Sequence, residues 1–459
     1  MLIKGGTVVG AAGERRADVL VAGERIEEVR PDIRAGGERV IDAGGLLVLP
    51  GVVDPHTHFL LDAGGVRTAD DFASASRSAA AGGVTTYLDF APQRPGERFL
   101  ETLASRRRLI DGQTVIDYGV HLNVNRLYPG WEDDLRALVS AGVTSAKIYT
   151  TYRDDIFYMD DWTWYRLMEG AARAGLLVQV HAENDAILDG KRRDLEAAGQ
   201  TSLAFHGASR PAIAETEAVG RALTFSRFSG SPVYLVHLSA PGSVDLVREA
   251  RAQGVRALAE TCPHFLALDD SVYAGPDAAR FLMTPPLRDR SLVDGLWQRL
   301  GDGSIHTVGS DHCGFALSAR LGVDDFRKVS PGVPGVETSL LVLYSLGVAG
   351  GRIDLATLVR VLCANPARVF GLWGRKGDLA PGFDADLVLF DPGPRRTLTA
   401  GELHSRAGFS PYEGMELVGK VKTTIARGEI VYDQAQVCAQ PGRGRYLPCA
   451  PFDPRLGLS

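Results

Sequence analysis

The 459-residue sequence predicts an α/β fold, a (β/α)8 TIM barrel with a small β-sandwich domain formed from both termini. Between residues 50 and 372, short apolar strands alternate with alanine- and leucine-rich helical stretches, as in βα units around a parallel sheet. Eight such strands can be assigned, which favours a closed barrel over an open doubly wound sheet. Both flanking regions contain strand and turn patterns without a helical period, and these indicate the second, smaller domain.

The region before the barrel, residues 1–49, contains short strand candidates separated by glycine-rich turns, at residues 2–4, 7–9, 18–21, 25–29 and 39–41. After the barrel, residues 373–433 return to strands and turns, and their last part is typical of a closing hairpin. We expect the two regions to pair into one sandwich. Residues 434–459 contain several prolines, glycines and arginines, so we expect an irregular C-terminal tail and a candidate oligomer contact.

Each predicted barrel strand is an apolar run, and the eight strands end at Val53, Asp89, Val124, Tyr149, Val180, Val236, Glu260 and Val308. Helical stretches between them are predicted at residues 70–81, 131–141, 162–174, 215–229 and 243–253. No glycine-rich G-x-G-x-x-G turn follows the first strand, which argues against a dinucleotide-binding domain.

The composition is that of an ordinary globular protein, with 45% hydrophobic and 23% charged residues. A net charge of -6 and the lack of a Lys/Arg-rich block predict no nucleic-acid partner. No apolar run approaches the roughly 20 residues of a membrane helix, so we expect no membrane association. The N-terminus is unlike a signal peptide, and the five cysteines lack CxxC spacing, which together predict a reducing, cytoplasmic location.

Two histidines, His56 and His58, stand near the end of the first predicted barrel strand. The apolar run at residues 46–49, bounded by glycines and Pro50, predicts a buried strand that leads to them. Because side chains alternate along a strand, the two histidines point to the same side and can reach one ion. Neutral imidazole is a common ligand of zinc. Taken alone, the pair is equally compatible with exposed loop histidines or with a hydrogen-bonded core histidine.

Further strand ends carry side chains that can bind a metal: Lys147, His181, His237 and Asp311. In a (β/α)8 barrel the carboxyl ends of all strands meet at one rim, which holds the active site. Each residue alone has a structural explanation, such as a core histidine, a helix-capping aspartate or an ion-paired lysine. Their joint occurrence at strand ends instead predicts a metal centre at this rim.

Lys147 is unexpected near metal ions, because its ammonium repels cations and because burial disfavours the charged form. A neutral buried amine can instead take up carbon dioxide. The resulting carbamate is an anion whose two oxygens can bridge two cations roughly 3.5–4 Å apart, as in two-metal hydrolases. A carbamylated Lys147 is therefore a hypothesis for this site.

Longer motifs connect these residues to a known group of enzymes. The sequence resembles cyclic amidohydrolases of the dihydropyrimidinase and D-hydantoinase group, within the amidohydrolase superfamily, over nearly the whole chain. The motifs that carry the resemblance lie at residues 50–58 (PGVVDPHTH), 68–72, 81–86, 147–152, 180–184, 209–211, 236–239, 260–263, 284–288, 309–313 and 334–337. The resemblance implies the barrel, the sandwich from both termini, and two divalent metal ions, usually zinc.

The resemblance also implies how the metals and the substrate are held. The first metal would be bound by His56, His58, carbamylated Lys147 (N6-carboxylysine) and Asp311, and the second by Lys147, His181 and His237. Tyr152 matches the tyrosine that donates to the developing oxyanion, and Thr284 matches a substrate-contacting position. Pro331 stands where the group commonly has asparagine, and its main chain is expected to contact the substrate ring without offering an N–H.

The implied reaction opens a cyclic amide, a hydantoin or a dihydropyrimidine, to an N-carbamoyl amino acid. A water activated by both metals attacks the ring carbonyl, Tyr152 stabilises the oxyanion, and Asp311 transfers the proton to the leaving nitrogen. We expect Tyr149, Ile156 and the loop at residues 59–66 to shape the pocket for the ring substituent. Relatives in this group are generally tetramers, so the resemblance implies a homo-oligomer.

Several positions leave the substrate open. His264 stands where hydantoinases usually have glutamine and, with residues 410–414, is similar to allantoinases, so hydrolysis of allantoin to allantoate is the alternative. The segment at residues 117–121 and the spacing from Lys147 to Tyr152 favour a dihydropyrimidinase. A dihydroorotate enzyme is expected to have an arginine soon after the histidine pair, which this sequence does not have. A non-catalytic scaffold, like the dihydropyrimidinase-related proteins, is disfavoured because all the predicted metal ligands are intact.

Overall fold

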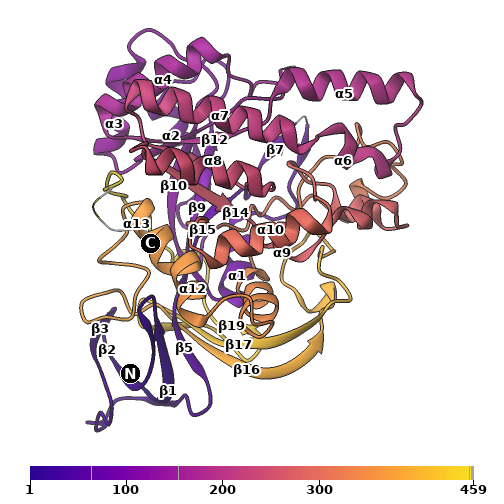
Figure 1. The fold of residues 1–459 in the computed structure, drawn as a ribbon. Coiled ribbons are helices and arrows are strands. Elements are labelled where there is room, and N and C mark those ends of the chain that lie inside the picture. Colours follow the sequence, from indigo (N-terminus) through magenta and orange to yellow (C-terminus); the bar gives the residue numbers. More distant parts are fainter. Residues whose placement is uncertain (64, 154, 454, 456–459) are drawn as a thin grey trace.

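A computed structural model describes residues 1–63, 65–153, 155–453 and 455 of the chain. At its centre, eight parallel strands follow one another in sequence order around a barrel (Figure 1). They are β6 (Val52–Thr57), β9 (Val84–Pro92), β10 (Asp117–Asn123), β11 (Ser145–Tyr149), β12 (Leu177–His181), β13 (Val233–Leu235), β14 (Ala257–Thr261) and β15 (Thr307–Val308). A parallel bridge between Thr57 and His312 joins the last strand region to the first, which brings the two edges of the sheet together.

Helices surround these strands: α1 (Phe72–Ala81), α2 (Phe99–Ile110), α3 (Trp131–Ser140), α4 (Asp161–Ala174), α5 (Asp185–Ala197), α6 (His206–Ser209), α7 (Ala212–Ser229), α8 (Pro241–Ala252), α9 (Pro263–Ala267), α10 (Arg290–Gly301), α11 (Ser339–Leu343), α12 (Leu355–Val359) and α13 (Asn365–Val369). The predicted helical stretches are confirmed by α1, α3, α4, α7 and α8. Capping sets their ends: at α4, Asp160 accepts from the backbone N–H of Thr163, and Gly175 ends the helix at φ 74°. Among the described residues, none of these helices is long and apolar enough to cross a membrane.

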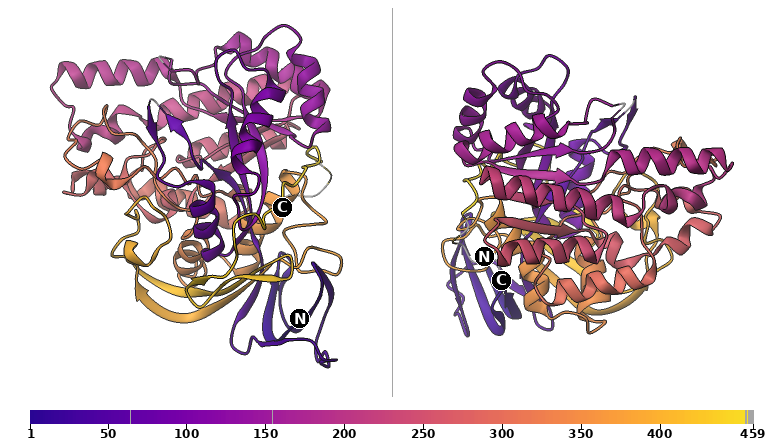
Figure 2. Two further views of the ribbon diagram at one scale, coloured as in Figure 1. Left: turned by 180° about the vertical axis from the view of Figure 1, so that it is seen from behind. Right: turned by 45° about the horizontal axis from the view of Figure 1, so that its top comes forward.

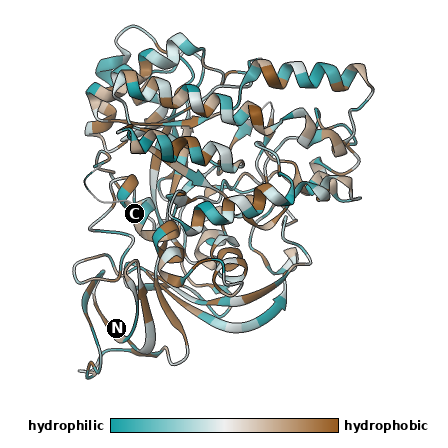
Figure 3. Cartoon of the chain, in the orientation of Figure 1, coloured by the Kyte–Doolittle hydropathy of each residue, from teal (hydrophilic) through white to brown (hydrophobic). Residues whose placement is uncertain are grey.

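The barrel strands are buried on both faces, because side chains fill the interior and helices cover the outside. Every residue of β6, β10, β12 and β14 is buried, which explains why these strands lack the alternation of apolar and polar residues that a half-exposed strand shows. Figure 3 shows hydrophobic residues along the central strands and hydrophilic residues on much of the outer helical surface. On the outer layer, the buried Trp164 of α4 packs edge-on against Phe225 of α7, with ring centroids 4.7 Å apart.

Both ends of the chain build a second, mixed sheet. Its strands are β1 (Leu2–Gly10), β2 (Gly13–Ala22), β3 (Arg25–Arg30), β4 (Val40–Asp42), β5 (Leu47–Pro50), β16 (Leu387–Thr397), β17 (Glu416–Ala426), β18 (Glu429–Asp433) and β19 (Gln436–Val437). The join lies between β5 and β16, which pair antiparallel from Leu47 to Pro50. Figure 2 shows from two further sides that the N-terminal and C-terminal strands lie side by side at one end of the molecule. The predicted fold class is thus confirmed.

The first barrel strand differs from its prediction. The apolar run at residues 46–49 does not lead directly to the histidines, because Leu47–Pro50 forms β5 of the terminal sheet. The chain crosses to the barrel at Gly51, and the barrel strand β6 then continues to Thr57 instead of ending at Val53. A side chain at Gly51 would clash, since an added Cβ would lie 2.1 Å from the Thr85 hydroxyl oxygen. Glycine therefore permits the crossing between the two sheets at this point.

The tail beyond β19 has little regular structure and packs across the end of the barrel where the strands begin. Its backbone is held by hydrogen bonds from Leu447 N–H to the Tyr118 carbonyl (2.7 Å) and from Cys449 N–H to the Gly142 carbonyl (2.9 Å). The Leu447 side chain is buried in a cluster with Val53 and other barrel residues. This part of the tail therefore helps to close the barrel.

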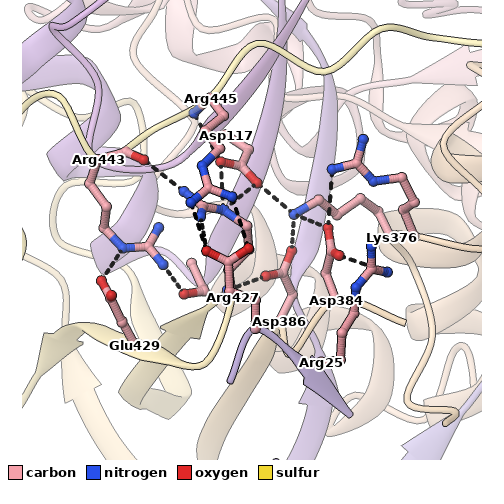
Figure 4. Close-up of polar contacts among 12 residues, drawn as sticks. Arg25, Asp117, Lys376, Asp384, Asp386, Arg427, Glu429, Arg443 and Arg445 are labelled. Atoms are coloured by element: carbon pink, nitrogen blue, oxygen red, sulfur yellow. Dashed lines mark hydrogen bonds and ion pairs between the residues drawn. The ribbon is translucent and has the colours of Figure 1, made fainter. Parts of the chain in front are cut away.

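A buried network of charged residues links the barrel to the terminal sheet (Figure 4). The Lys376 ammonium is completely buried and lies 2.8 Å from Asp117, 3.1 Å from Asp384 and 2.7 Å from Asp386. Arg427, in the turn between β17 and β18, donates to the same Asp117 carboxylate at 3.1 Å. Because Asp117 begins the barrel strand β10 and Asp386 precedes β16, the network joins the two parts of the fold.

Candidate metal centre and active site

The six predicted metal ligands come together where barrel strands end: His56 and His58 near the end of β6, Lys147 in β11, His181 at the end of β12, and His237 and Asp311 just after β13 and β15. The Lys147 amine nitrogen lies 2.8 Å from Nε2 of His56 and 3.5 Å from Nε2 of His58. One carboxylate oxygen of Asp311 lies 3.2 Å from Nε2 of His56 and 3.3 Å from Nε2 of His58. These four side chains therefore face one small volume.

The remaining two histidines border the same volume. The His181 and His237 rings are edge-to-face with centroids 4.6 Å apart, and His237 stacks on His56 at 5.4 Å. Ligand atoms of His56, His237 and Asp311 all lie within 4.8 Å of one another. Imidazole nitrogens with a carboxylate are a donor set that suits a divalent metal.

Three site residues have backbone conformations that non-glycine residues rarely adopt. Tyr152, His237 and Asp311 have φ values of 70°, 41° and 47°. Each follows a barrel strand and turns the chain sharply at the rim. Such left-handed conformations cost of order 1–3 kcal/mol and concentrate at functional sites.

A buried glutamate of β14 orients two of the histidines. Glu260 lies 2.6 Å from Nδ1 of His56 and accepts a hydrogen bond of 2.9 Å from the backbone N–H of His237. Because Nδ1 of His56 is engaged, its Nε2 is the nitrogen that remains to bind a metal. Tyr234 donates a further hydrogen bond of 2.7 Å to Glu260 and helps to fix the carboxylate.

A second carboxylate plays the same part for His181. Glu183 lies 2.8 Å from Nε2 of His181 and pairs with the guanidinium of Arg210. Nδ1 of His181 is then the nitrogen left for a metal. The sequence motifs contained Glu183, Arg210 and Glu260, but the sequence analysis assigned them no role. The available signal was a glutamate at or near the end of a strand that is largely apolar, where an unpaired charge would be costly to bury.

Burial keeps the histidines in the form that binds metals. It lowers the pKa of His56 and His58 to about 3, so both imidazoles are neutral near pH 7. Burial also lowers the pKa of Lys147 to about 8, although the nearby Asp311 acts in the opposite direction. For Asp311, burial would raise the pKa, but the surrounding histidines hold it well below its usual value. The residues present therefore fit a metal centre.

An orphaned nitrogen on a residue of the cluster supports this fit. Nδ1 of His237 is buried and has no hydrogen-bond partner among the described residues. Buried polar atoms normally have a partner, so this unpaired ring nitrogen points to an additional ligand. Nδ1 of His58 is also buried without a partner among the described residues, but Nε2 of that ring is the nitrogen that faces Lys147 and Asp311, so its Nδ1 gives no evidence for a metal.

A cavity of about 480 Å³ opens onto the ligand cluster. Tyr152 and Thr284 both line it, and their hydroxyl oxygens lie 2.6 Å apart. Pro331 lines it as well, between Ser330 and Gly332. The three residues predicted to contact the substrate therefore share this cavity with the candidate metal centre.

The expectation for the substituent pocket is partly wrong. Tyr149 and the loop residues Leu61 and Val66 line the cavity, but Ile156 does not. The Ile156 side chain is 48% exposed and faces a separate surface depression. Its neighbour Phe157 occupies the predicted place, in contact with Tyr149 at a ring-centroid distance of 5.3 Å. The turn after β11 decides which of the two adjacent apolar residues points inward.

Known proteins share the sequence and the fold of this chain. Residues 47–431 match the amidohydrolase family. A D-hydantoinase from Geobacillus stearothermophilus is 37% identical, covering 98% of this chain and 97% of that protein. A D-phenylhydantoinase from Escherichia coli O1:K1 is 38% identical, covering 99% of both. The crystal structure of dihydropyrimidinase from Brevibacillus agri NCHU1002 is 38% identical, with a TM-score of 0.96 and coverage of 98% of this chain and 99% of that one.

The chain belongs to the amidohydrolase family. The resemblance to its dihydropyrimidinase and D-hydantoinase group, first seen in the motifs, is confirmed over the whole length of the relatives.

Proposed function

We propose that this protein is a cyclic amidohydrolase that opens hydantoin or dihydropyrimidine rings to N-carbamoyl amino acids. One observation carries the proposal: the ligand cluster of His56, His58, Lys147 and Asp311 borders a cavity that also contains the Tyr152 hydroxyl. A cluster of side chains that can bind metal ions, next to a hydroxyl that can donate a hydrogen bond, suits the hydrolysis of an amide. In that reaction negative charge develops on a carbonyl oxygen.

Two divalent metal ions, which we propose to be zinc, fit the cluster. His56, His58, Lys147 and Asp311 would hold one ion, and Lys147, His181 and His237 the other. Such a pair, when bound, polarises a carbonyl and makes hydroxide available at neutral pH. Glu260 and Glu183 fix the histidine tautomers from behind and so keep one nitrogen of each ring toward the centre.

Lys147 would serve as a carbamate. Its amine is buried beside two imidazole nitrogens, and burial outweighs the attraction of Asp311 and Glu260 and lowers its pKa, so an ammonium is poorly placed among metal ions. Addition of the neutral amine to carbon dioxide forms an N–C bond and releases one proton. The product is an anion with two oxygens, which suits a position shared by two cations.

Tyr152 and Asp311 would carry the proton and charge movements. The Tyr152 hydroxyl, 2.6 Å from the Thr284 oxygen, donates a hydrogen bond to the oxygen of the scissile carbonyl. Burial raises the pKa of Tyr152 to about 12, so the hydroxyl keeps its proton at neutral pH. Asp311 accepts the proton of the attacking water and delivers it to the leaving ring nitrogen.

Thr284 and the main chain around Pro331 would orient the ring. Thr284 offers a hydroxyl beside Tyr152, and the backbone carbonyl of Pro331, which lines the cavity, would accept from a ring N–H. Because Pro331 has no N–H, hydrogen-bond donors for ring carbonyls must come from other residues.

A substrate panel tests this function. Purified protein, supplied with zinc and bicarbonate, is assayed with hydantoin, 5-substituted hydantoins, dihydrouracil and allantoin, and bound metal is counted by elemental analysis. We expect about two metals per chain and ring opening of hydantoins or dihydrouracil. Turnover of allantoin alone would support the alternative, allantoinase, and metal-loaded protein inactive on the whole panel would support a non-catalytic scaffold.

We also propose a homo-oligomer, with a tetramer as the expected form, in a cytoplasmic setting. Trp162 on α4 is 67% exposed, and Ile213 and Phe228 on α7 are 59% and 75% exposed. Large apolar side chains on two neighbouring helices suit a contact with a second copy of the chain. All five cysteines are free, as a reducing compartment requires. Light scattering of the wild-type protein and of Phe228→Ser tests the assembly.

A further inference from the structure

His264 is a cavity residue that the mechanism above does not use. It follows the barrel strand β14 and is the second residue of the short helix α9 at the rim. Its side chain lines the same cavity as Tyr152 and Asp311 and is only 2% exposed. It therefore stands within the region that holds the substrate in the proposed reaction.

The imidazole of His264 lacks hydrogen-bond partners. Both of its ring nitrogens are buried without a partner among the described residues, which holds for none of the other described histidines. Buried histidines elsewhere in the barrel are engaged: His121 contacts Ser145 and the Pro55 carbonyl, and His306 accepts from the backbone N–H of Ala259 at 3.1 Å. Burying a polar group without a partner is unfavourable, so this ring is expected to have a hydrogen-bond partner that the described residues do not supply.

Packing alone does not explain a histidine at this position. The ring lies against Phe265, with centroids 4.3 Å apart, and an apolar side chain would fill the same space without an unpaired nitrogen. Burial lowers the pKa of His264 to about 4, so the ring is neutral and offers one N–H donor and one acceptor nitrogen.

We propose that His264 is a substrate-binding residue that hydrogen-bonds a polar group of the cyclic amide other than the scissile carbonyl. This inference rests on the proposed function. A hydantoin or dihydropyrimidine ring contains a second carbonyl and N–H groups that the Tyr152 hydroxyl does not engage. His264 supplies a donor for that carbonyl, in a cavity where Pro331 cannot offer one from its main chain.

The test compares two substitutions in the metal-loaded enzyme. His264→Leu removes both polar atoms, and we expect kcat/KM for hydantoin and dihydrouracil to fall about tenfold to hundredfold, mainly through KM. His264→Gln keeps a donor and an acceptor, and we expect it to restore kcat/KM to within about tenfold of the wild type. Metal content and the melting temperature are measured for each variant, because a purely structural role would change stability without separating leucine from glutamine in KM.

The matched control is His306→Gln, a substitution of another buried histidine, which lies directly before β15 and accepts at Nδ1 from the backbone N–H of Ala259. We expect it to lower the melting temperature and to leave KM unchanged. A metal-loaded His264→Leu enzyme with wild-type kcat/KM on every accepted substrate would overturn the proposal. If the wild type opens no ring, the function proposed above fails, and the role of His264 is tested separately by calorimetry, which measures the binding of hydantoin to the wild type and to His264→Leu. Equal Kd values for the two proteins, or no binding by either, would then overturn the proposal for His264.

Discussion

Lys147 is the residue whose surroundings demand the most explanation. A buried amine beside two imidazole nitrogens gains little from its own charge, and metal ions at this place would repel the ammonium. Conversion to a carbamate reverses the sign of the charge without moving the side chain from its strand. This single change would turn a group that opposes metal binding into one that both metals share.

Lys147→Ala is expected to lose at least one metal per chain, because a shared ligand is removed. The loss in kcat/KM should exceed about 100-fold, the upper range for residues that only support metal ligands. Elemental analysis and steady-state kinetics measure the two effects. Acetate added to the variant provides a carboxylate in place of the carbamate and should return part of the metal. A variant with two metals and full activity would rule out the carbamate bridge.

Tyr152→Phe is expected to lower kcat about 10²- to 10³-fold with little loss of metal, because it removes one donor to the developing oxyanion. The aromatic ring at position 152 remains, and its centroid stays about 5.5 Å from that of the His181 ring, as in the wild type. Tyr158→Phe is the matched control, since Tyr158 lies in the same loop region but outside the cavity lining. Steady-state kinetics give kcat for both variants, and equal kcat values would exclude Tyr152 as the hydrogen-bond donor to the oxyanion.

At the scale of single elements, β14 organises the site without contributing a predicted metal ligand. β14 lies between β13 and β15 in the barrel. Its carboxyl end is therefore next to the ends of the two strands that His237 and Asp311 follow. Glu260 from this strand reaches the His56 ring and the His237 backbone. The segment between β14 and α10, which contains the short helix α9, brings His264 and Thr284 to the same cavity. One strand and the segment after it therefore connect the proposed metal ligands with the proposed substrate contacts.

Glu260→Gln is expected to weaken metal binding about 10- to 100-fold, because the neutral amide supports the His56 ring less well than a carboxylate. Competition with a zinc chelator measures the affinity. The fold should persist, since the amide oxygen can take the place of Oε1, which His56 and the His237 backbone N–H contact. The amide nitrogen can then donate to the Tyr234 hydroxyl, which keeps Thr307 as a partner. Glu217→Gln on the exposed face of α7 serves as the control. An unchanged zinc affinity would mean that Glu260 has no part in positioning the histidine.

At the scale of the whole molecule, the two ends of the chain enclose the barrel. β5 and β16 pair across more than 300 residues, and the tail closes the end where the strands begin. The charged network around Lys376 lies between these parts (Figure 4). Three carboxylates surround one buried ammonium, and the guanidinium groups of Arg427 and Arg25 pair with two of these carboxylates, Asp117 and Asp384. The terminal sheet and the tail thus stabilise the barrel, while the carboxyl ends of the barrel strands carry the candidate active site.

Lys376→Met should destabilise the protein by about 3–5 kcal/mol, because three carboxylates would stay buried without their main counter-charge. Denaturant unfolding of the metal-loaded protein measures the change. Lys422→Met, at an exposed position of β17 in the same protein, should change stability by less than about 0.5 kcal/mol. Similar unfolding midpoints for the two variants would show that the network is not a principal link between barrel and sheet.

The sequence by itself determined the barrel, the terminal sheet and the strand ends that carry His56, Lys147 and Asp311. It could do so because apolar runs and their spacing are local properties, and because parallel strands all end at one rim. Tertiary structure alone decided the crossing at Gly51, the support of His56 by Glu260, and the inward turn of Phe157 instead of Ile156. Each of these depends on distances between segments far apart in the chain, or on the path of one loop, which residue patterns do not encode.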